Sequence, residues 1–227
     1  FFKQKTAYEI KECDWSSDVC SSDLGDRKPI AKDWSGRTLT DCDWSDRVLT
    51  GSCLNDTVFK GSVAIRCVLR AVPAQRANAD ESNFSQADLR HADFRGASLS
   101  VCDFENATLC GINLQGANLA GSNFQGANLA RANLSGADLS GANLSRANLA
   151  EANLNGANCE ASNLSELTAP GAVFREATLN GANLRLADLS DCDFARAKAV
   201  AAIFERAALR GAMFEQTDRK STRLNSS

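Results

Sequence analysis

The chain has 227 residues, with 25 Lys and Arg against 28 Asp and Glu, and a formal net charge of −3 at pH 7. This mild acidity argues against a nucleic-acid-binding surface, because such a surface needs clustered Lys and Arg. The sequence holds no apolar run as long as a transmembrane helix, and its first residues do not have the layout of a signal peptide. We therefore expect a cytoplasmic protein with no nucleic-acid partner and no membrane contact.

The two ends of the chain differ from its middle. Residues 1–31 show neither a helix period nor a strand period, and the chain closes with DRKSTRLNSS. Both ends resemble the translated sequencing-adapter read-through found in proteins from metagenomic assemblies. We interpret residues 1–31 as a non-native or disordered leader and residues 217–227 as a non-native tail, with an ordinary disordered tail plus a cap as the alternative. If this interpretation holds, we expect the chain to be a fragment of a longer protein. Cys13 and Cys20 would then come from the adapter and have no role in function.

A period of five residues begins at Trp34 and continues without a slip to Phe214. Of the 37 positions at this period, 31 are Leu, Phe or Trp. Two residues before each large position the side chain is Ala, Cys, Ser or Thr at 31 of the 37 positions, and Asn or Asp usually lies between. A step of five advances about 140° around a helix and changes the face of a strand. Neither a continuous helix nor a flat strand therefore keeps the large side chains together.

The period predicts a chain that is extended for about three residues and then turns a corner within each pentad. The residue two after the large one is often Gly, as at Gly111 and Gly116, and Gly turns at the least steric cost. Corners repeated in the same sense wind the chain into a solenoid with one interior for the large and small side chains. The Asn and Asp side chains then point outward, where their amides can bond the nearby backbone or the next coil.

These pentads resemble the signature of the pentapeptide repeat family, which is Ala, Asn or Asp, Leu or Phe, and two variable residues. The resemblance covers residues 32–216, and the motif is unbroken from Ala77 to Asn163. It implies an all-β fold, a right-handed quadrilateral parallel β-helix with about 20 residues per coil and about nine coils. Phe recurs at a spacing of 20 residues, but a spacing of 10 fits equally well, so the number of sides comes from the resemblance alone. The residues expected in the core include Leu89, Phe104, Leu114, Leu119, Phe124, Leu129, Leu134, Leu139, Leu144, Leu149, Leu154, Phe174, Leu184 and Phe194.

Three stretches depart from the motif. Residues 62–81 hold Ala at three of the large positions and predict an irregular coil, with an inserted helix or loop as the alternative. Residues 167–170, Leu-Thr-Ala-Pro, predict a local bulge. Residues 197–214 are rich in Ala, and we expect them to continue the coil rather than to form a capping helix.

The sequence offers few candidates for chemistry. His91 is the only histidine and falls at a corner, where we expect a solvated side chain. Asp41, Asp43 and Asp46 are close in sequence and could dock a basic partner or a metal, although solvated corner acids are the simpler interpretation. Five of the seven cysteines in the repeat take core positions, as free thiols do, and no CxxC or Cys/His pattern indicates zinc. We predict no catalytic, cofactor-binding or metal-binding residues, and no enzyme activity.

Two functions remain open. The first is a non-catalytic rod that binds an unknown protein partner or spaces two domains, and an end-to-end homodimer is compatible with it. The second follows from the resemblance, because some pentapeptide repeat proteins mimic duplex DNA, bind a type II topoisomerase and protect it from quinolones. That mimicry needs ordered acidic columns, whereas the outward column from Asp43 to Asn183 holds only two acids at 20-residue spacing. We therefore favour the rod.

Overall fold

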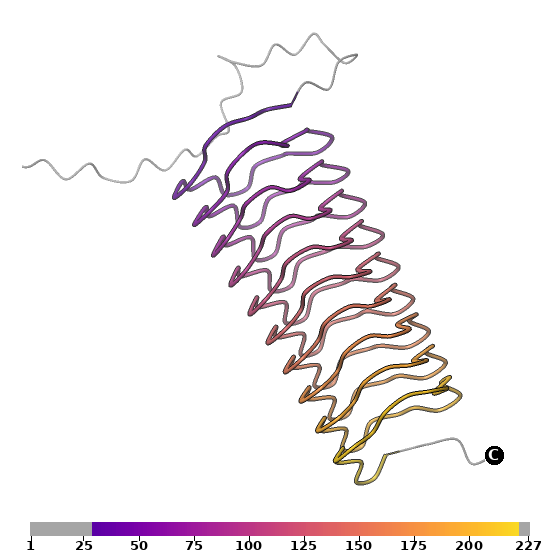
Figure 1. Cartoon of the computed structure of the whole chain (residues 1–227). Helices are drawn as coiled ribbons and strands as arrows, with labels where there is room; N and C mark the ends of the chain where they lie inside the picture. The colour runs from indigo at the N-terminus through magenta and orange to yellow at the C-terminus, as the bar shows by residue number, and fades with distance from the viewer. Residues whose placement is uncertain (1–28, 223–227) are drawn as a thin grey trace, which may run out of the picture.

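The computed structural model describes residues 29–222, which wind into one straight rod (Figure 1). With one exception, Cys53, the outward residue of each pentad pairs with the residue 20 positions later in a parallel β-bridge, from Asp33↔Cys53 to Lys198↔Asp218. One coil is therefore four pentads and has four sides. Each side contributes a single bridging residue rather than a longer strand, and residues 29–222 contain no helix. The fold is the right-handed quadrilateral β-helix of about nine coils that the family resemblance implies.

We name the four sides by their large residues, which recur every 20 residues. Side A runs from Trp34 to Phe214, side B from Leu39 to Ala199, side C from Trp44 to Phe204, and side D from Leu49 to Leu209. A corner takes the names of the two sides that it joins, in chain order: AB, BC, CD and DA.

Backbone hydrogen bonds join each coil to the next. Leu119 N–H donates to the Asp138 carbonyl at 2.7 Å, and Asn118 N–H donates to the Ala97 carbonyl at 2.9 Å. The same two bonds, one toward each neighbouring coil, recur along the rod. Backbone groups on the sides are thus satisfied between coils, and each coil is held by its two neighbours.

The corners need a left-handed backbone. The second corner residue has a positive φ in every pentad from Gly36 to Ser221, and glycine occupies fewer than half of these positions. The next residue closes the corner, as when Ala117 N–H donates to the Leu114 carbonyl at 3.0 Å. A left-handed conformation costs a non-glycine residue about 1–2 kcal/mol. The glycines in the sequence therefore mark only part of the corners.

The interior is filled by the large and small residues along the whole rod. All fourteen residues predicted for the core are at most 1% exposed. On side C, Phe104 stacks between Phe84 and Phe124 at ring-centroid distances of 5.2 and 4.7 Å. Rings that stack at the repeat distance of a β-ladder show that the side chains inside follow the register of the backbone.

Polar side chains at small positions bond the backbone inside the rod. Ser122 Oγ donates to the Leu99 carbonyl at 2.7 Å and accepts the Cys102 N–H at 3.0 Å. Ser62 and Ser82 make the same pair of bonds on side C. Because the hydroxyl both donates and accepts a hydrogen bond, serine replaces alanine here without leaving a buried polar group unsatisfied.

The stretches that depart from the motif are regular in the structure. Residues 62–81 keep the same corners and, with one exception, the same bridges, so the expected irregular coil and its helical alternative are both absent. In Leu167 to Ala169 the large and small residues exchange places, and both are buried. This exchange leaves the total side-chain volume inside the coil unchanged, so the predicted bulge does not form.

The C-terminal end also differs from the prediction. Residues 197–214 continue the coil, as we favoured, and the coil passes the predicted limit at residue 216 to reach Thr222. Arg219 takes a large position there, and its guanidinium lies over the Phe214 ring, 4.8 Å from the centroid. Most of the predicted leader, residues 1–31, and the end of the predicted tail lie outside the described residues.

Candidate functional site

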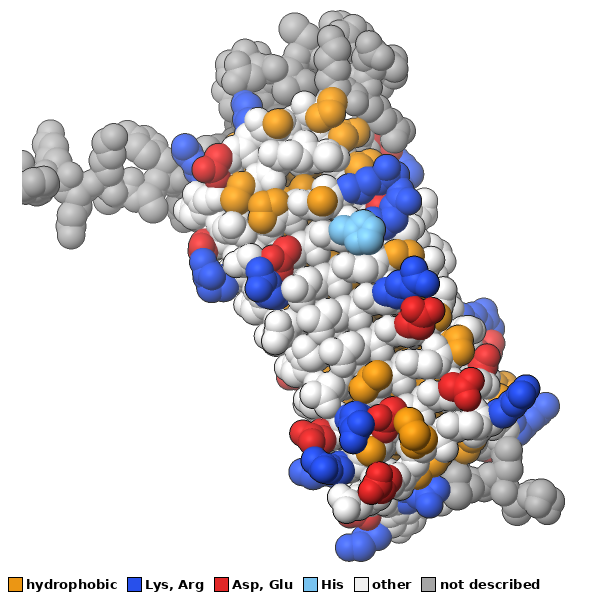
Figure 2. Space-filling view, viewed as in Figure 1, with side chains coloured by type: hydrophobic (Ala, Val, Ile, Leu, Met, Phe, Trp, Pro, Cys, Tyr) orange, Lys and Arg blue, Asp and Glu red, His pale blue; other side chains and the backbone are white. Residues whose placement is uncertain are grey.

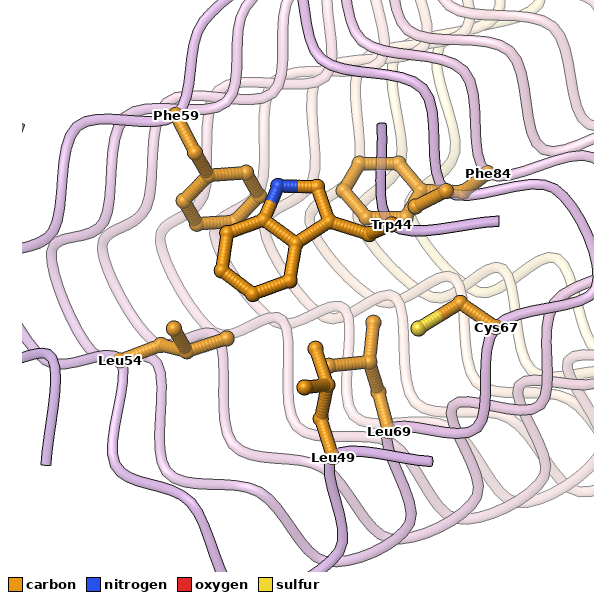
Figure 3. Close-up of a pocket in the computed structure, with 8 residues that line it drawn as sticks. Trp44, Leu49, Leu54, Phe59, Cys67, Leu69 and Phe84 are labelled. Atoms are coloured by element: carbon orange, nitrogen blue, oxygen red, sulfur yellow. The ribbon is translucent and has the colours of Figure 1, made fainter. Parts of the chain in front are cut away.

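Within residues 29–222 the interior offers no room for a substrate. A cavity of about 10 Å³ lies beside Ala64, where a small side chain takes a large position (Figure 3). Its walls are apolar, and the Trp44 indole lies between the Phe59 and Phe84 side chains in this view. The one titratable group in the wall is Cys67, and burial raises the pKa of its thiol to about 12. A void near the volume of one water molecule, without a charged group, cannot hold a small molecule or activate it.

The three acids proposed as a partner surface do not converge. Asp41 lies at corner BC, with its carboxylate over Gly61 of the next coil. Asp43 lies on side C, where its Oδ1 accepts the Ser45 N–H at 2.9 Å, and this bond lowers the pKa of Asp43. Asp46 lies at corner CD and pairs with Arg66 of the next coil at 2.6 Å. The structure spreads the acids across the width of one side, so they do not converge on one point as metal ligands would. Their role as a surface for a partner stays a prediction.

The remaining candidates for chemistry are isolated. His91 is exposed at corner DA with φ 59°, as expected for a solvated corner residue. No group of His, Cys, Asp and Glu in the described residues is arranged to hold a metal ion. Burial raises the pKa of the thiol to about 12 at four free cysteines, which are Cys67, Cys102, Cys159 and Cys192. Thiols of this kind are protonated near neutral pH and do not act as nucleophiles.

The outer surface of the sides is built from amide ladders. Asn143 Nδ2 donates to Asn123 Oδ1 at 3.1 Å, and Asn163 Nδ2 donates to Asn143 Oδ1 at 3.1 Å. The same Asn143 Oδ1 also accepts the Ser145 N–H at 3.2 Å. Both outward roles expected for these residues are therefore present, and uncharged amides form much of the outer surface of the middle coils.

Ion pairs link the corners of successive coils. Arg131 Nε lies 3.0 Å from Glu151 Oε2 at corner DA, and Arg146 Nε lies 3.0 Å from Glu166 Oε2 at corner CD. Figure 2 shows that Lys and Arg lie beside Asp and Glu on one face, while much of its middle is uncharged. Each of these four side chains is more than 45% exposed, so water screens the pairs and they contribute little to stability. The pairs cancel charge along the corners rather than build a charged surface.

Asp88 is the most strongly perturbed described acid. Burial raises its pKa, but hydrogen bonds from Arg90 and Arg70 outweigh burial and lower the pKa to about 2. Arg90 Nη2 lies 2.8 Å from Asp88 Oδ2, and Arg70 reaches the same oxygen from the preceding coil. Sequence reasoning missed this cluster and the ion pairs. The available signal for most of the ion pairs was opposite charges 18 or 20 residues apart. That spacing predicts contact only once the coil length is known.

The comparisons with known proteins agree with this geometry. The family model for pentapeptide repeats matches eight copies, over residues 67–106, 102–141, 142–181, 152–191 and 187–225. The chain belongs to the pentapeptide repeat family. No curated protein sequence is similar enough to be given as a relative. No helix of the described residues of this repeat protein is long and apolar enough to cross a membrane.

Solved structures of other proteins match most of this chain. HetL, involved in heterocyst differentiation regulation in the cyanobacterium Nostoc sp. strain PCC 7120, is 26% identical with a TM-score of 0.47, over 88% of this chain and 90% of HetL. A trypsin-treated form of QnrB1, a plasmid-mediated fluoroquinolone resistance protein, is 17% identical with a TM-score of 0.55, over 86% of this chain and 92% of QnrB1. At this identity, the likeness to QnrB1 shows a common fold and nothing of function.

Proposed function

We propose that this pentapeptide repeat protein is a stiff, non-catalytic rod that binds a protein partner or spaces two parts of an assembly. The observation that carries the proposal is the interior, which is filled by apolar side chains along residues 34–214 and leaves no pocket for a substrate in the described part. Backbone bonds between all successive coils resist bending. The outer surface combines flat amide ladders with variable corners, which suits recognition by contact rather than chemistry.

A distance measurement tests the stiffness. Labels on non-natural residues at Ser98 and Lys198 would lie on side B, five coils apart, which corresponds to about 24 Å at about 4.8 Å per coil. We expect one narrow distance distribution near this value, widened only by the labels. A control pair at Ser98 and Asn118 reports the width due to the labels over a single coil. A distribution for the long pair much broader than the control contradicts a stiff rod.

Cross-linking tests the binding. A photo-cross-linking residue at Asn133 samples side A, and the same residue at Asn143 samples side C. If the rod docks a partner, we expect a discrete cross-linked product from one side and little from the other. Equal, diffuse products from both sides would indicate nonspecific contact. The partner-binding role would then be wrong, and only the spacer role would remain.

DNA mimicry is the second candidate, because the middle coils are acidic. Residues 96–170 hold six Asp and Glu against two Lys and Arg. Two of these acids pair with Arg131 and Arg146, and the unpaired remainder does not form a column along one side. We therefore expect no protection of DNA gyrase supercoiling from a quinolone at micromolar rod. Protection at that concentration would favour mimicry over the rod module.

A further inference from the structure

Two neighbouring coils of the described rod, residues 42–61 and residues 62–81, meet at a contact with a small internal void and one missing bridge. We propose that the rod opens at this contact, so that the coils before residue 62 undock from the body as a unit while the two faces of the break remain coiled. Two structural observations place the opening point here, and ion pairs across the contact make the opening depend on ionic strength.

The interior is least filled in the second of these coils. Its four large positions hold Ala64, Leu69, Ala74 and Ala79, whereas the coil that follows holds Phe or Leu at all four. Neighbours replace part of the missing volume, as in the edge-to-face pair of Phe59 and Phe84 at 6.0 Å. The cavity beside Ala64 remains, and its wall is made mostly of side chains from these two coils. Lost contacts across a void weaken the packing of one coil on the next.

The bridges between coils are interrupted at the same contact. Every outward residue from Asp33 to Lys198 bridges to the residue 20 positions later except Cys53, whose partner would be Pro73. Proline has no N–H to give to the ladder. The outward residues from Val48 to Pro73 are also all apolar, so they supply no amide ladder like that of Asn143 in the body. The side-chain cap at this contact comes instead from a corner residue, because Asn55 Oδ1 accepts the Gln75 N–H at 2.8 Å.

Ion pairs hold the contact closed. Arg66 pairs with Asp46, Arg76 pairs with Asp56, and Glu81 pairs with Lys60, at 2.6, 2.7 and 2.9 Å. All three pairs join the two coils, and every side chain in them is at least 40% exposed. Salt screens exposed pairs of this kind, so the contact should open more often as ionic strength rises.

Amide hydrogen exchange on the full chain tests the proposal, because single N–H groups report single contacts. Val63 N–H and Val68 N–H donate to carbonyls of the coil before them, across the proposed break. Val58 N–H donates across the previous contact, nearer the end of the rod, and Asn83 N–H donates across the next. We expect Val63 and Val68 to exchange at least as fast as Val58 and at least tenfold faster than Asn83. Simple fraying from the end instead gives rates that fall steadily from Val58 to Val63 to Asn83, and that result, or equal rates at Val63 and Asn83, would overturn the proposal.

Variants separate the causes. Ala64→Val fills the void and should slow exchange at Val63 and Val68 at least threefold, whereas the control Ala169→Val, at a large position that does not line this void, should leave both rates unchanged. The double variant Arg66→Gln, Arg76→Gln should speed their exchange and remove most of its dependence on salt. Exchange that is the same at low and high salt in the unmodified chain would contradict the role given to the ion pairs.

Discussion

Replacing Leu134 by Asp provides the sharpest check of which residues face inward. Leu134 is fully buried on side A, and loss of its apolar burial costs about 2–3 kcal/mol. The introduced carboxyl has no partner charge inside the rod, so it stays protonated. Holding a carboxyl of ordinary pKa near 3.9 neutral at pH 7 costs about 4 kcal/mol more, at about 1.4 kcal/mol for each pH unit. The sum, about 6–7 kcal/mol, is comparable to the whole stability of a typical domain.

The two parts of this cost respond differently to pH. The introduced carboxyl has a raised pKa in the folded state, so its penalty is present above the unfolded pKa and disappears as the pH falls toward about 4. Urea unfolding followed by circular dichroism should therefore show a deficit that shrinks to about 2–3 kcal/mol at pH 4. Ser135→Asp is the matched control, because Ser135 faces outward and its Oγ bonds only Asn133 Oδ1, at 2.8 Å. We expect that change to cost less than about 0.5 kcal/mol. Equal losses for the two variants, or a deficit for Leu134→Asp that does not shrink on acidification, would refute the assignment of inside and outside.

Three further predictions concern single residues. The carboxylate of Asp88 has a pKa of about 2 in the folded chain, so its ionised form stabilises the rod above about pH 4. Asp88→Asn should therefore lower the free energy of unfolding in urea by up to about 2 kcal/mol at pH 7. The difference between the two proteins should vanish as the pH falls to about 2. Gly136 has φ 64° and open space around an added Cβ, so Gly136→Ala should cost about 1 kcal/mol through the backbone alone, and an unchanged unfolding midpoint would contradict this. Iodoacetamide at pH 8 should modify the half-buried Cys53 long before the buried Cys159 in the native rod, as read by mass spectrometry; equal rates would mean that the interior opens as a whole.

Much of the fold could be predicted because the pentad is a local pattern. The position of Leu119 inside and of Asn118 outside follows from the alternation of an extended segment, and the corner follows from the need to keep successive large residues on one side. The number of sides could not be derived in this way. A five-residue period fixes the content of one side but not the angle of the corner, so the coil length came from the resemblance.

The misjudged segments depend on contacts between coils. The alanines in residues 62–81 suggest irregularity when they are read along the chain, yet Phe59 and Phe84, in the coils before and after, fill part of their space. The tail from residue 217 lacks the motif, but Thr217 and Thr222 donate side-chain hydrogen bonds to carbonyls 23 residues earlier and keep the coil in register. The acids near Asp43 are close in sequence but separated by the width of a side. In each case the deciding neighbour is about one coil away.

The 20-residue spacing of the bridges also limits how such a chain can change in length. Inserting five residues would keep every large side chain inside, but it would rotate everything downstream by a quarter turn. Phe104 would then no longer stack on Phe124, and Asn123 would face a new neighbour in place of Asn143. Duplication or deletion of four pentads together avoids this mismatch, because the coils before and after the change then stack each side on the same side of the neighbouring coil. Length variation among relatives of this protein should therefore come in steps of whole coils.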